Sequence, residues 1–262
     1  MQKLKTLSVT KASAFDDIEL INEFSVKELT PEDVYCFSVT LCDNEVDRDG
    51  ERFTDATLDQ LAKLFVGKTG IFDHNWSAQN QVARLYRAEV QTTEQQNRLG
   101  EPLKQLVGSA YMLRTESTKA LIEAIEGGII KEVSVGVSVV NQKCNICGEQ
   151  FEMNWQTWEY ECMNHHKKGQ EYDGQLCVCE LDGAADAYEF SFVAVPAQRG
   201  AGVTKSVETL DDAFAVLMAA DLSSCSDQLK KLLPRIQTAL ASAADREARR
   251  AIIEENKKYL KG

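Results

Sequence analysis

The sequence predicts an α+β protein that carries a cysteine-rich insertion and ends in a helical tail. Three observations support this fold class. Short apolar segments with the alternation typical of strands recur between Val34 and Ala197, and they enclose two short helical patterns. Five of the eight cysteines fall between Cys144 and Cys179. After Ser206 the strand patterns give way to segments rich in Leu, Ala, Lys and Glu.

The first predicted elements are a strand at 34–42, an acidic turn at 43–50 and a helix. Thr54 is placed to cap this helix, which runs through Phe65 and ends at Gly67. The remaining body elements are strands at 81–90 and 106–113 separated by a turn at 97–100, a short helix at 117–126 stopped by Gly127 and Gly128, and strands at 129–140 and 188–197. The acidic turn resembles a calcium-binding loop, but the alignment places Ala56 where the bidentate glutamate belongs, which disfavours calcium.

Residue composition and pattern divide the chain into three parts. Residues 1–140 and 180–205 form the body, residues 141–179 form the insertion, and residues 206–262 form the tail. Helices are predicted in the tail at 208–220, 225–243 and 245–260, with Pro234 as an interruption of the second.

Charge and hydropathy exclude several classes of function. The net charge is −12 and no stripe of Lys and Arg is present, which argues against sequence-independent binding of nucleic acid. No segment reaches the roughly 18 to 20 apolar residues of a membrane helix, and the first residues lack the apolar run of a signal peptide. We therefore expect a soluble protein made in a cytoplasm, with no membrane partner.

The clustered cysteines predict a metal site, because a reducing compartment disfavours disulfides. Cys144 and Cys147 are two residues apart, as in zinc knuckles, and Cys162 follows after 14 residues. His165, His166 and Cys177 compete for the fourth position. Four protein ligands leave no open position, so the predicted zinc is structural and the insertion is similar to a zinc ribbon.

His74 is the one imidazole left for acid–base chemistry, because the other two histidines lie in the cysteine segment. Ser134 is the better nucleophile candidate in the strand pattern at 129–140, since Gly136 lets a substrate backbone come close. A serine needs a base that meets it in space, and strand pairing can close the 60 residues between the two. On residue types alone, a lone histidine beside aromatic residues is more often structural.

Three segments together resemble a known family. The segment 72–75 (Phe-Asp-His-Asn) with 82–84 (Val-Ala-Arg), the segment 132–137 (Glu-Val-Ser-Val-Gly-Val) and the segment 188–197 (Tyr-Glu-Phe-Ser-Phe-Val-Ala-Val-Pro-Ala) occur in the order found in prohead proteases of tailed bacteriophages. That family consists of serine peptidases related in fold to the herpesvirus assembly proteases. The resemblance covers about residues 35–205 and implies a β-barrel-like mixed core with flanking helices.

The resemblance implies roles for individual residues. Ser134 matches the nucleophile and His74 the general base. Glu189 is the first choice for the group that orients the imidazole, and Asp73 is the second. Among the metal ligands, similarity to relatives in the insertion favours His166 or Cys177, and we take His166. Backbone amides near Gly136 are expected to stabilise the oxyanion. Arg199 is a speculative second donor, and its position is better explained as that of a solvated turn residue. Ser138 and Ser191 are expected to be strand serines without chemistry.

The expected function is that of an endopeptidase of phage head assembly. It would act in the host cytoplasm, inside the procapsid, and cleave scaffold protein, capsid protein and itself. The insertion is rich in aromatic residues that can contact scaffold or capsid protein: Trp155, Trp158, Tyr160 and Tyr172. The alternative is a catalytically inactive, zinc-bearing scaffolding or structural protein of the phage head with the same fold; an unrelated zinc-ribbon binding module is a third possibility.

Overall fold

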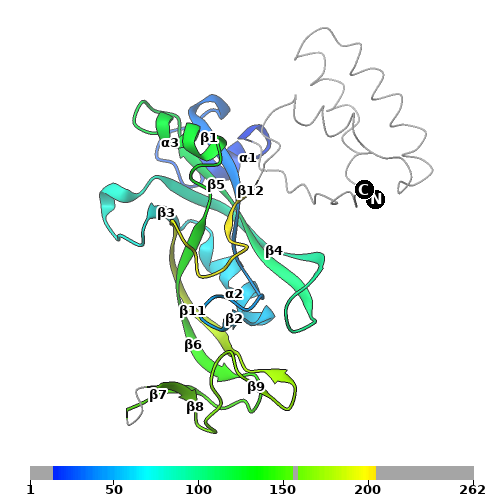
Figure 1. Cartoon of the computed structure of the whole chain (residues 1–262). Coiled ribbons are helices and arrows are strands. Elements are labelled where there is room, and N and C mark those ends of the chain that lie inside the picture. Colours follow the sequence, from blue (N-terminus) through cyan, green and yellow to red (C-terminus); the bar gives the residue numbers. More distant parts are fainter. Residues whose placement is uncertain (1–13, 156–158, 205–262) are drawn as a thin grey trace, which may run out of the picture. The chain divides into compact units, whose positions relative to one another are not determined.

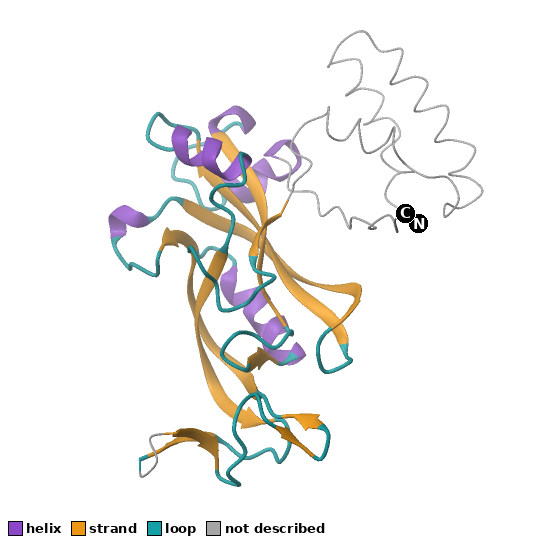
Figure 2. Cartoon of the chain, viewed as in Figure 1, coloured by secondary structure: helices purple, strands orange, loops and turns teal. Residues whose placement is uncertain are grey.

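The computed structural model describes residues 14–155 and 159–204, which have a mixed α+β fold with one large sheet and few helices (Figures 1 and 2). The predicted fold class is confirmed at this level. The predicted helices of the tail lie outside the described residues, as does Trp158.

The elements follow the chain in a simple order. The helices are α1 (Ala14–Asn22), α2 (Asp55–Phe65) and α3 (Lys119–Glu126), with single 3-10 turns η1 (Pro31–Asp33) and η2 (Ala78–Asn80). The strands of the large sheet are β1 (Val34–Asp43), β2 (Glu51–Phe53), β3 (Thr69–Phe72), β4 (Ala83–Gln96), β5 (Pro102–Leu113), β6 (Val133–Cys144), β11 (Cys179–Phe192) and β12 (Gly202–Thr204). The insertion adds β7 (Phe151–Asn154), β8 (Glu159–Cys162), β9 (Glu171–Tyr172) and β10 (Gln175–Leu176).

The large sheet has the strand order β12-β1-β5-β4-β3-β11-β2, and β6 pairs with β11. Strands β2 and β3 run parallel to β11, whereas the other pairs are antiparallel. An isolated bridge between Glu132 and Gly202 connects the start of β6 to β12, so the sheet curves back toward its first edge. A second bridge joins Lys143 to Gln150. Between these two bridges, β6 has no strand on the side opposite β11 in the described part of the chain.

Helix α2 packs against β11 and β4 and is positioned by its own sequence. The Thr54 hydroxyl accepts the Thr57 amide hydrogen at 3.2 Å, which confirms the predicted N-cap. Leu58, Leu61 and Phe65 are fully buried on the apolar face of the helix. Burying each such side chain contributes about 1.5 to 3 kcal/mol, so the helix is fixed mainly by packing against the sheet.

Several predicted strands have other boundaries in the structure. Strand β4 continues to Gln96, and β5 begins at Pro102. Strand β11 begins at Cys179, well before the predicted start at Tyr188, and ends at Phe192. Strand β6 runs to Cys144, so the predicted boundary of the insertion at residue 141 falls inside a strand. The reason for the last two differences is pairing between β6 and β11, which continues from Val133 opposite Phe192 to Cys144 opposite Cys179.

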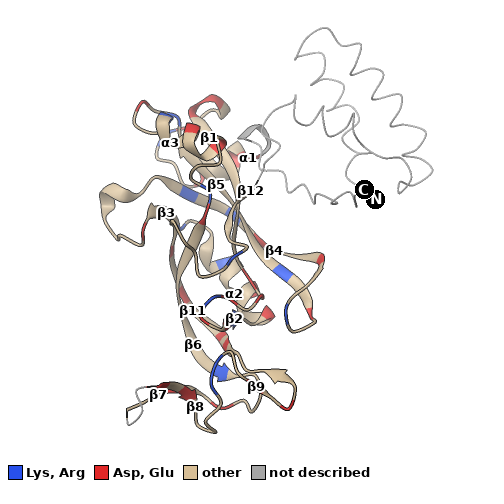
Figure 3. Ribbon diagram, viewed as in Figure 1, with Lys and Arg blue, Asp and Glu red and all other residues tan. Residues whose placement is uncertain are grey.

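Lys and Arg are scattered over the described elements without forming a continuous stripe (Figure 3). No helix among the described residues has the length and hydropathy needed to cross a membrane.

Candidate functional site

Three neighbouring strands, β3, β11 and β6, bring the predicted catalytic residues together. Ser191 on β11 lies directly opposite Ser134 on β6, and Glu189 lies opposite Gly136. Because residues directly opposite each other share a face of the sheet, the side chains of Ser134, Glu189 and Ser191 project on the same side. His74 follows the end of β3, which pairs with β11 on its other side.

Gly136 has a different role from the one its sequence context suggests. A Cβ atom built on Gly136 would lie 2.3 Å from Glu189 Oε1. The missing side chain therefore leaves room for the carboxylate of Glu189, whereas the sequence predicted room for a substrate backbone. Any larger residue at this position would displace the carboxylate.

His74 lies in a tight turn that β11 holds in place. Asp73 and His74 have positive φ angles of 50° and 52°, and the Asn75 amide donates to the Phe72 carbonyl at 2.9 Å. Such angles cost about 1 to 2 kcal/mol for each residue with a side chain. The His74 amide donates to Ser191 Oγ at 3.0 Å, one of the contacts that fix this unusual turn.

The side chains of His74, Glu189 and Ser191 form a closed hydrogen-bond network. His74 Nδ1 lies 2.7 Å from Glu189 Oε1, and the Ser191 hydroxyl donates to Glu189 Oε2 at 2.7 Å. Because Ser191 also accepts from the His74 amide, the three residues form a ring of contacts. Glu189 is 2% exposed and Ser191 is fully buried, whereas the side chain of His74 is 42% exposed.

This arrangement fixes the imidazole in the form that a general base requires. A carboxylate only accepts hydrogen bonds, so Nδ1 of neutral His74 carries the proton and donates to Glu189. Nε2 is then the proton acceptor. When it takes a proton, the buried carboxylate of Glu189 stabilises the resulting imidazolium.

Ser134 lies beside this network. In a directly opposed pair of an antiparallel sheet the Cβ atoms are about 5 Å apart, so Ser134 is an immediate neighbour of Ser191. Its side chain is half-buried and makes no hydrogen bond with any described residue. A nucleophile and its base often reach hydrogen-bond distance only when substrate is bound.

The other residues considered from the sequence are placed differently. Asp73 is exposed in the turn, and Nδ1 of His74 contacts Glu189 instead. Arg199 is exposed in the loop between β11 and β12. Ser191 was expected to be a strand serine without chemistry, but it contacts both Glu189 and His74. The Glu-x-Ser spacing on a strand was the signal for it, since residues two apart share a face.

A second cluster lies at the other end of β6 and β11. Cys144, Cys147, Cys162 and His166 place one ligand atom each within 4.8 Å of one another, so the group can hold a metal ion. Cys147 Sγ lies 3.6 Å from Cys162 Sγ, and Cys144 Sγ lies 3.6 Å from His166 Nδ1. Tetrahedral zinc with bonds of about 2.3 Å to sulfur separates two thiolates by about 3.8 Å, which fits this donor set.

The position of His165 and Cys177 narrows the choice of fourth ligand. His165 points away from the cluster, with Nδ1 at 3.0 Å from Glu161 Oε1 and a side chain that is 76% exposed. Cys177 is buried and its Sγ lies 3.8 Å from Cys144 Sγ, so it is a fourth thiol, beside the three of the cluster. His166 therefore belongs to the cluster, as expected from the sequence.

The thiols of the cluster differ in acidity. Burial raises the pKa of Cys162 to about 11 and also raises the pKa values of Cys144 and Cys177. Burial acts in the same direction on Cys147, but hydrogen bonds to the Glu149 amide and to neighbouring side chains outweigh it and lower its pKa to about 7. A bound cation converts buried thiols to thiolates, so metal binding at this cluster releases protons.

The aromatic residues of the insertion are partly used for internal packing. Tyr160 stacks on Phe151 with ring centroids 5.8 Å apart, and Tyr172 packs edge-on against His166 at 4.5 Å. Trp155 is 73% exposed. Among the described aromatic residues predicted to contact a partner, Trp155 is therefore the most exposed.

Comparisons with protein-family models, with curated proteins and with solved structures returned no match.

Proposed function

We propose that the chain is a serine endopeptidase in which Ser134 is the nucleophile, His74 the general base and Glu189 the group that orients and stabilises the imidazole. The observation that carries the proposal is the short contact between His74 Nδ1 and the buried carboxylate of Glu189, on the face of the sheet that also holds Ser134. These residues come from three separate segments, so their convergence is a property of the fold.

The proposed reaction follows from this geometry. His74 Nε2 takes the proton of the Ser134 hydroxyl as Oγ attacks the carbonyl carbon of a peptide bond. The imidazolium, stabilised by Glu189, then gives its proton to the leaving amine as the C–N bond breaks. Water, deprotonated by the same Nε2, attacks the acyl-enzyme, and the imidazolium returns this proton to Ser134 Oγ as the ester C–O bond breaks. Backbone amides near Gly136 are the proposed donors to the oxyanion.

The substrate assignment rests on the resemblance of the three sequence segments to prohead proteases of tailed bacteriophages. On this basis we propose that the enzyme cleaves scaffold protein, capsid protein and itself inside the procapsid. Trp155 of the insertion, which is 73% exposed, is the proposed point of contact with one of these proteins.

The cysteine cluster supports a separate proposal, a structural zinc ion held by Cys144, Cys147, Cys162 and His166. The donor chemistry, with three sulfurs and one nitrogen, and the spacing of the ligand atoms fit this ion. Freshly purified protein is expected to contain about one equivalent of zinc by mass spectrometry. Less than half an equivalent would contradict the assignment.

Two measurements test the peptidase. Co-expression with the capsid and scaffold proteins is expected to give processed bands with the natural sequence and none with Ser134→Ala, whereas Ser138→Ala, on the same strand but opposite Asp186, still cleaves. A fluorophosphonate probe is expected to label Ser134 without any protein substrate. Normal processing by the Ser134→Ala variant would show that the nucleophile is wrong. Absence of both cleavage and labelling in the natural sequence would favour the inactive scaffolding protein.

A further inference from the structure

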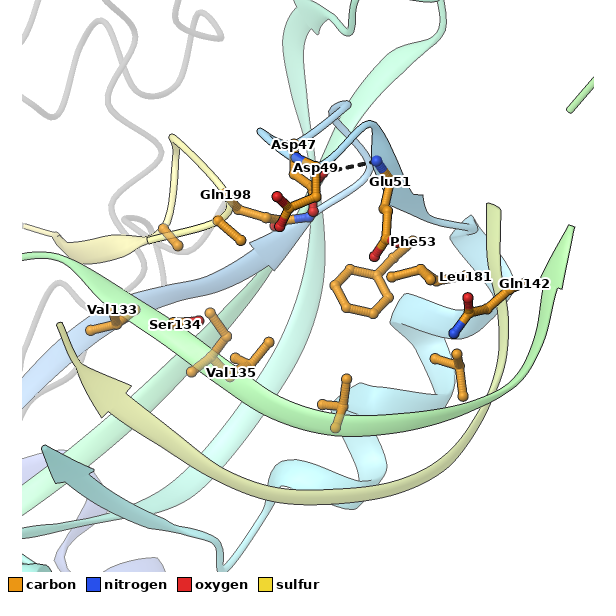
Figure 4. Close-up of a pocket in the computed structure, with 15 residues that line it drawn as sticks. Asp47, Asp49, Glu51, Phe53, Val133, Ser134, Val135, Gln142, Leu181 and Gln198 are labelled. Carbon is orange, nitrogen blue, oxygen red and sulfur yellow. Dashed lines mark hydrogen bonds between the residues drawn. The ribbon is translucent and has the colours of Figure 1, made fainter. Parts of the chain in front are cut away.

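A cavity of about 250 Å³ lies along the unpaired edge of β6 (Figure 4). One wall is β6 itself, and the other is formed by the β1–β2 loop and the β11–β12 loop, which are joined by the Arg48 amide donating to the Ala197 carbonyl at 3.1 Å. We call this cavity the β6 groove. Ser134 lines it, whereas His74, Glu189 and Ser191 do not.

The edge of β6 offers backbone groups to the groove. The Val193 amide donates to the Glu132 carbonyl at 3.1 Å, and the Val203 amide donates to the Lys131 carbonyl at 2.7 Å. The backbone carbonyl of Glu132 thus points to β11, and that of Lys131 points to the opposite edge of the strand. Since this direction alternates along an antiparallel strand, the N–H and C=O groups of Val135 also point to the groove edge, where the described chain provides no strand partner.

The side chains around the groove combine an apolar floor with an acidic rim. The floor is formed mainly by residues of β6, β2 and β11: Val135, Val137, Val139, Phe53 and Leu181. Asp47 and Asp49 stand on the rim (Figure 4) and have no ion pair with any described residue. Glu51 differs, because Lys168 pairs with it at 2.7 Å.

The rim is also well ordered by its own hydrogen bonds. Asp47 Oδ1 accepts the amide hydrogens of Asp49 at 2.9 Å and Glu51 at 2.8 Å. This leaves Oδ2 of Asp47 and the exposed carboxylate of Asp49 for a ligand. The charge at the groove is therefore negative and is complementary to a basic side chain.

We propose that the β6 groove binds an extended peptide segment as an additional strand on β6, with apolar side chains on the valine floor and a Lys or Arg side chain at Asp47 and Asp49. Main-chain hydrogen bonds to the strand edge supply affinity, and the alternate side chains supply selectivity. Because Ser134 lines the same groove, this segment is the substrate if the proposed peptidase function holds. The substrate class is then an extended peptide with apolar and basic residues.

Binding to the full-length Ser134→Ala variant separates this proposal from catalysis. Fluorescence anisotropy is measured with a labelled peptide of alternating Val and Lys, and with the same peptide carrying Glu in place of Lys. The Lys peptide is expected to bind at least about tenfold more tightly. Asp47→Asn with Asp49→Asn is expected to remove most of this preference, because both negative charges are lost. The turn should stay folded, because the Asn side chain at position 47 keeps the Oδ1 acceptor of the Asp49 and Glu51 amides. Glu94→Gln with Glu126→Gln, two exposed positions outside the groove, is the matched control and should leave the preference unchanged.

Strand addition has its own test. Two further Lys peptides carry N-methyl groups on alternate amides, one on the odd and one on the even positions. A peptide that pairs with one strand edge loses binding in one version and keeps it in the other. Equal binding of the two versions, equal binding of the Lys and Glu peptides, or no binding of any peptide would overturn the proposal. Loss of peptidase activity with an intact Lys preference would refute only the proposed function.

Discussion

The two ends of the β6–β11 pair both hold a histidine, but they hold it in opposite ways. At one end, near Cys144 and Cys179, His166 Nδ1 lies among the thiols of the cysteine–histidine cluster. At the other end, near Val133 and Phe192, His74 Nδ1 contacts the single buried carboxylate of Glu189. The same pair of strands therefore supports a closed set of ligands and an open, half-exposed imidazole.

The difference shows what the surroundings of a histidine decide. Four donors that converge on one point leave no position for substrate, which suits a structural ion. An imidazole fixed at one nitrogen, with 42% of its side chain exposed, suits proton transfer. Because the two histidines lie at opposite ends of the strand pair, a substitution at one end is expected to leave the other end intact.

The largest effect is expected at the cysteine end of the β6–β11 pair. Cys147→Ser should abolish zinc binding, because three ligands hold the ion poorly, and the lost contribution to folding of the insertion is on the order of 10 kcal/mol. Zinc content and amide hydrogen exchange of residues 145–178 measure this. Labelling of Ser134 by the fluorophosphonate probe should persist.

Cys177→Ser is the matched control for this variant. Cys177 lies beside the cluster, 3.8 Å from Cys144 Sγ, but is not among its four members. The variant should therefore retain about one equivalent of zinc. Equal zinc loss from both variants would show that Cys177, and not His166, completes the site.

The second largest effect is expected at the His74 end of the strand pair, where Glu189→Gln should lower the peptidase activity. The amide can donate to His74 Nδ1, which favours the wrong tautomer, and the negative charge that stabilises the imidazolium is lost. We expect kcat to fall about 10⁴-fold, as when the carboxylate of a Ser-His-Asp triad is replaced by an amide. Asp73→Asn, in the exposed turn, should change kcat less than about tenfold. A larger loss from Asp73→Asn would reverse the assignment of the third residue.

The sequence predicted best what depends on local patterns. The helix from Asp55 to Phe65 and its cap at Thr54 follow from the apolar spacing and the capping residue. Cys144 and Cys147 were identified because a knuckle is local in sequence. The choice between His165 and His166 depends on backbone geometry that two adjacent, identical residues do not reveal in the sequence. His165 has a φ of 61°, and its side chain is 76% exposed.

Features that depend on pairing between distant strands were predicted less well. The length of β11 follows from its partner β6, and no turn signal in its own sequence marks its start at Cys179. The role of Ser191 requires the turn at His74 to lie against β11. The sequence marks Gly136 as a position of close approach, but only the opposed position of Glu189 shows why a side chain is excluded there.

The buried carboxyl group of Asp43, in β1, is expected to make the free energy of unfolding depend on pH. Burial raises its pKa from the ordinary value of 3.8 to about 6, although the Glu45 amide acts in the opposite direction. The folded protein thus binds the proton more tightly than the unfolded chain, so this group stabilises the fold below about pH 4 and the stabilisation is lost as pH rises through about 6. The full shift corresponds to about 3 kcal/mol.

Asp43→Asn tests this pH dependence, because Asn keeps the Oδ1 acceptor for the Glu45 amide at 3.0 Å. The variant should be about 2 to 3 kcal/mol more stable than the natural sequence at pH 7.5 and equally stable at pH 4. Urea unfolding at both pH values gives the two free energies. A difference that does not change with pH would contradict the prediction.

The smallest effect, and the most specific, is expected for Ser191→Ala. The variant removes the donor to Glu189 Oε2 and the acceptor of the His74 amide, each at 3.0 Å or less, without touching Ser134. We expect kcat to fall about tenfold with little change in KM, because one lost hydrogen bond to a charged group costs about 1.5 kcal/mol. Ser138→Ala, on β6, should change kcat less than about twofold.

A double-variant cycle decides whether Ser191 acts through Glu189. If Ser191 positions the carboxylate, Ser191→Ala should cost almost nothing further in the Glu189→Gln background, since the group it orients has already lost its charge. If Ser191 acts mainly by holding the His74 turn, the same tenfold loss should appear in both backgrounds. The first outcome makes the His74 end of the strand pair a single cooperative unit built on one buried carboxylate, in contrast to the cysteine end, where four residues converge on one position that can hold a metal ion.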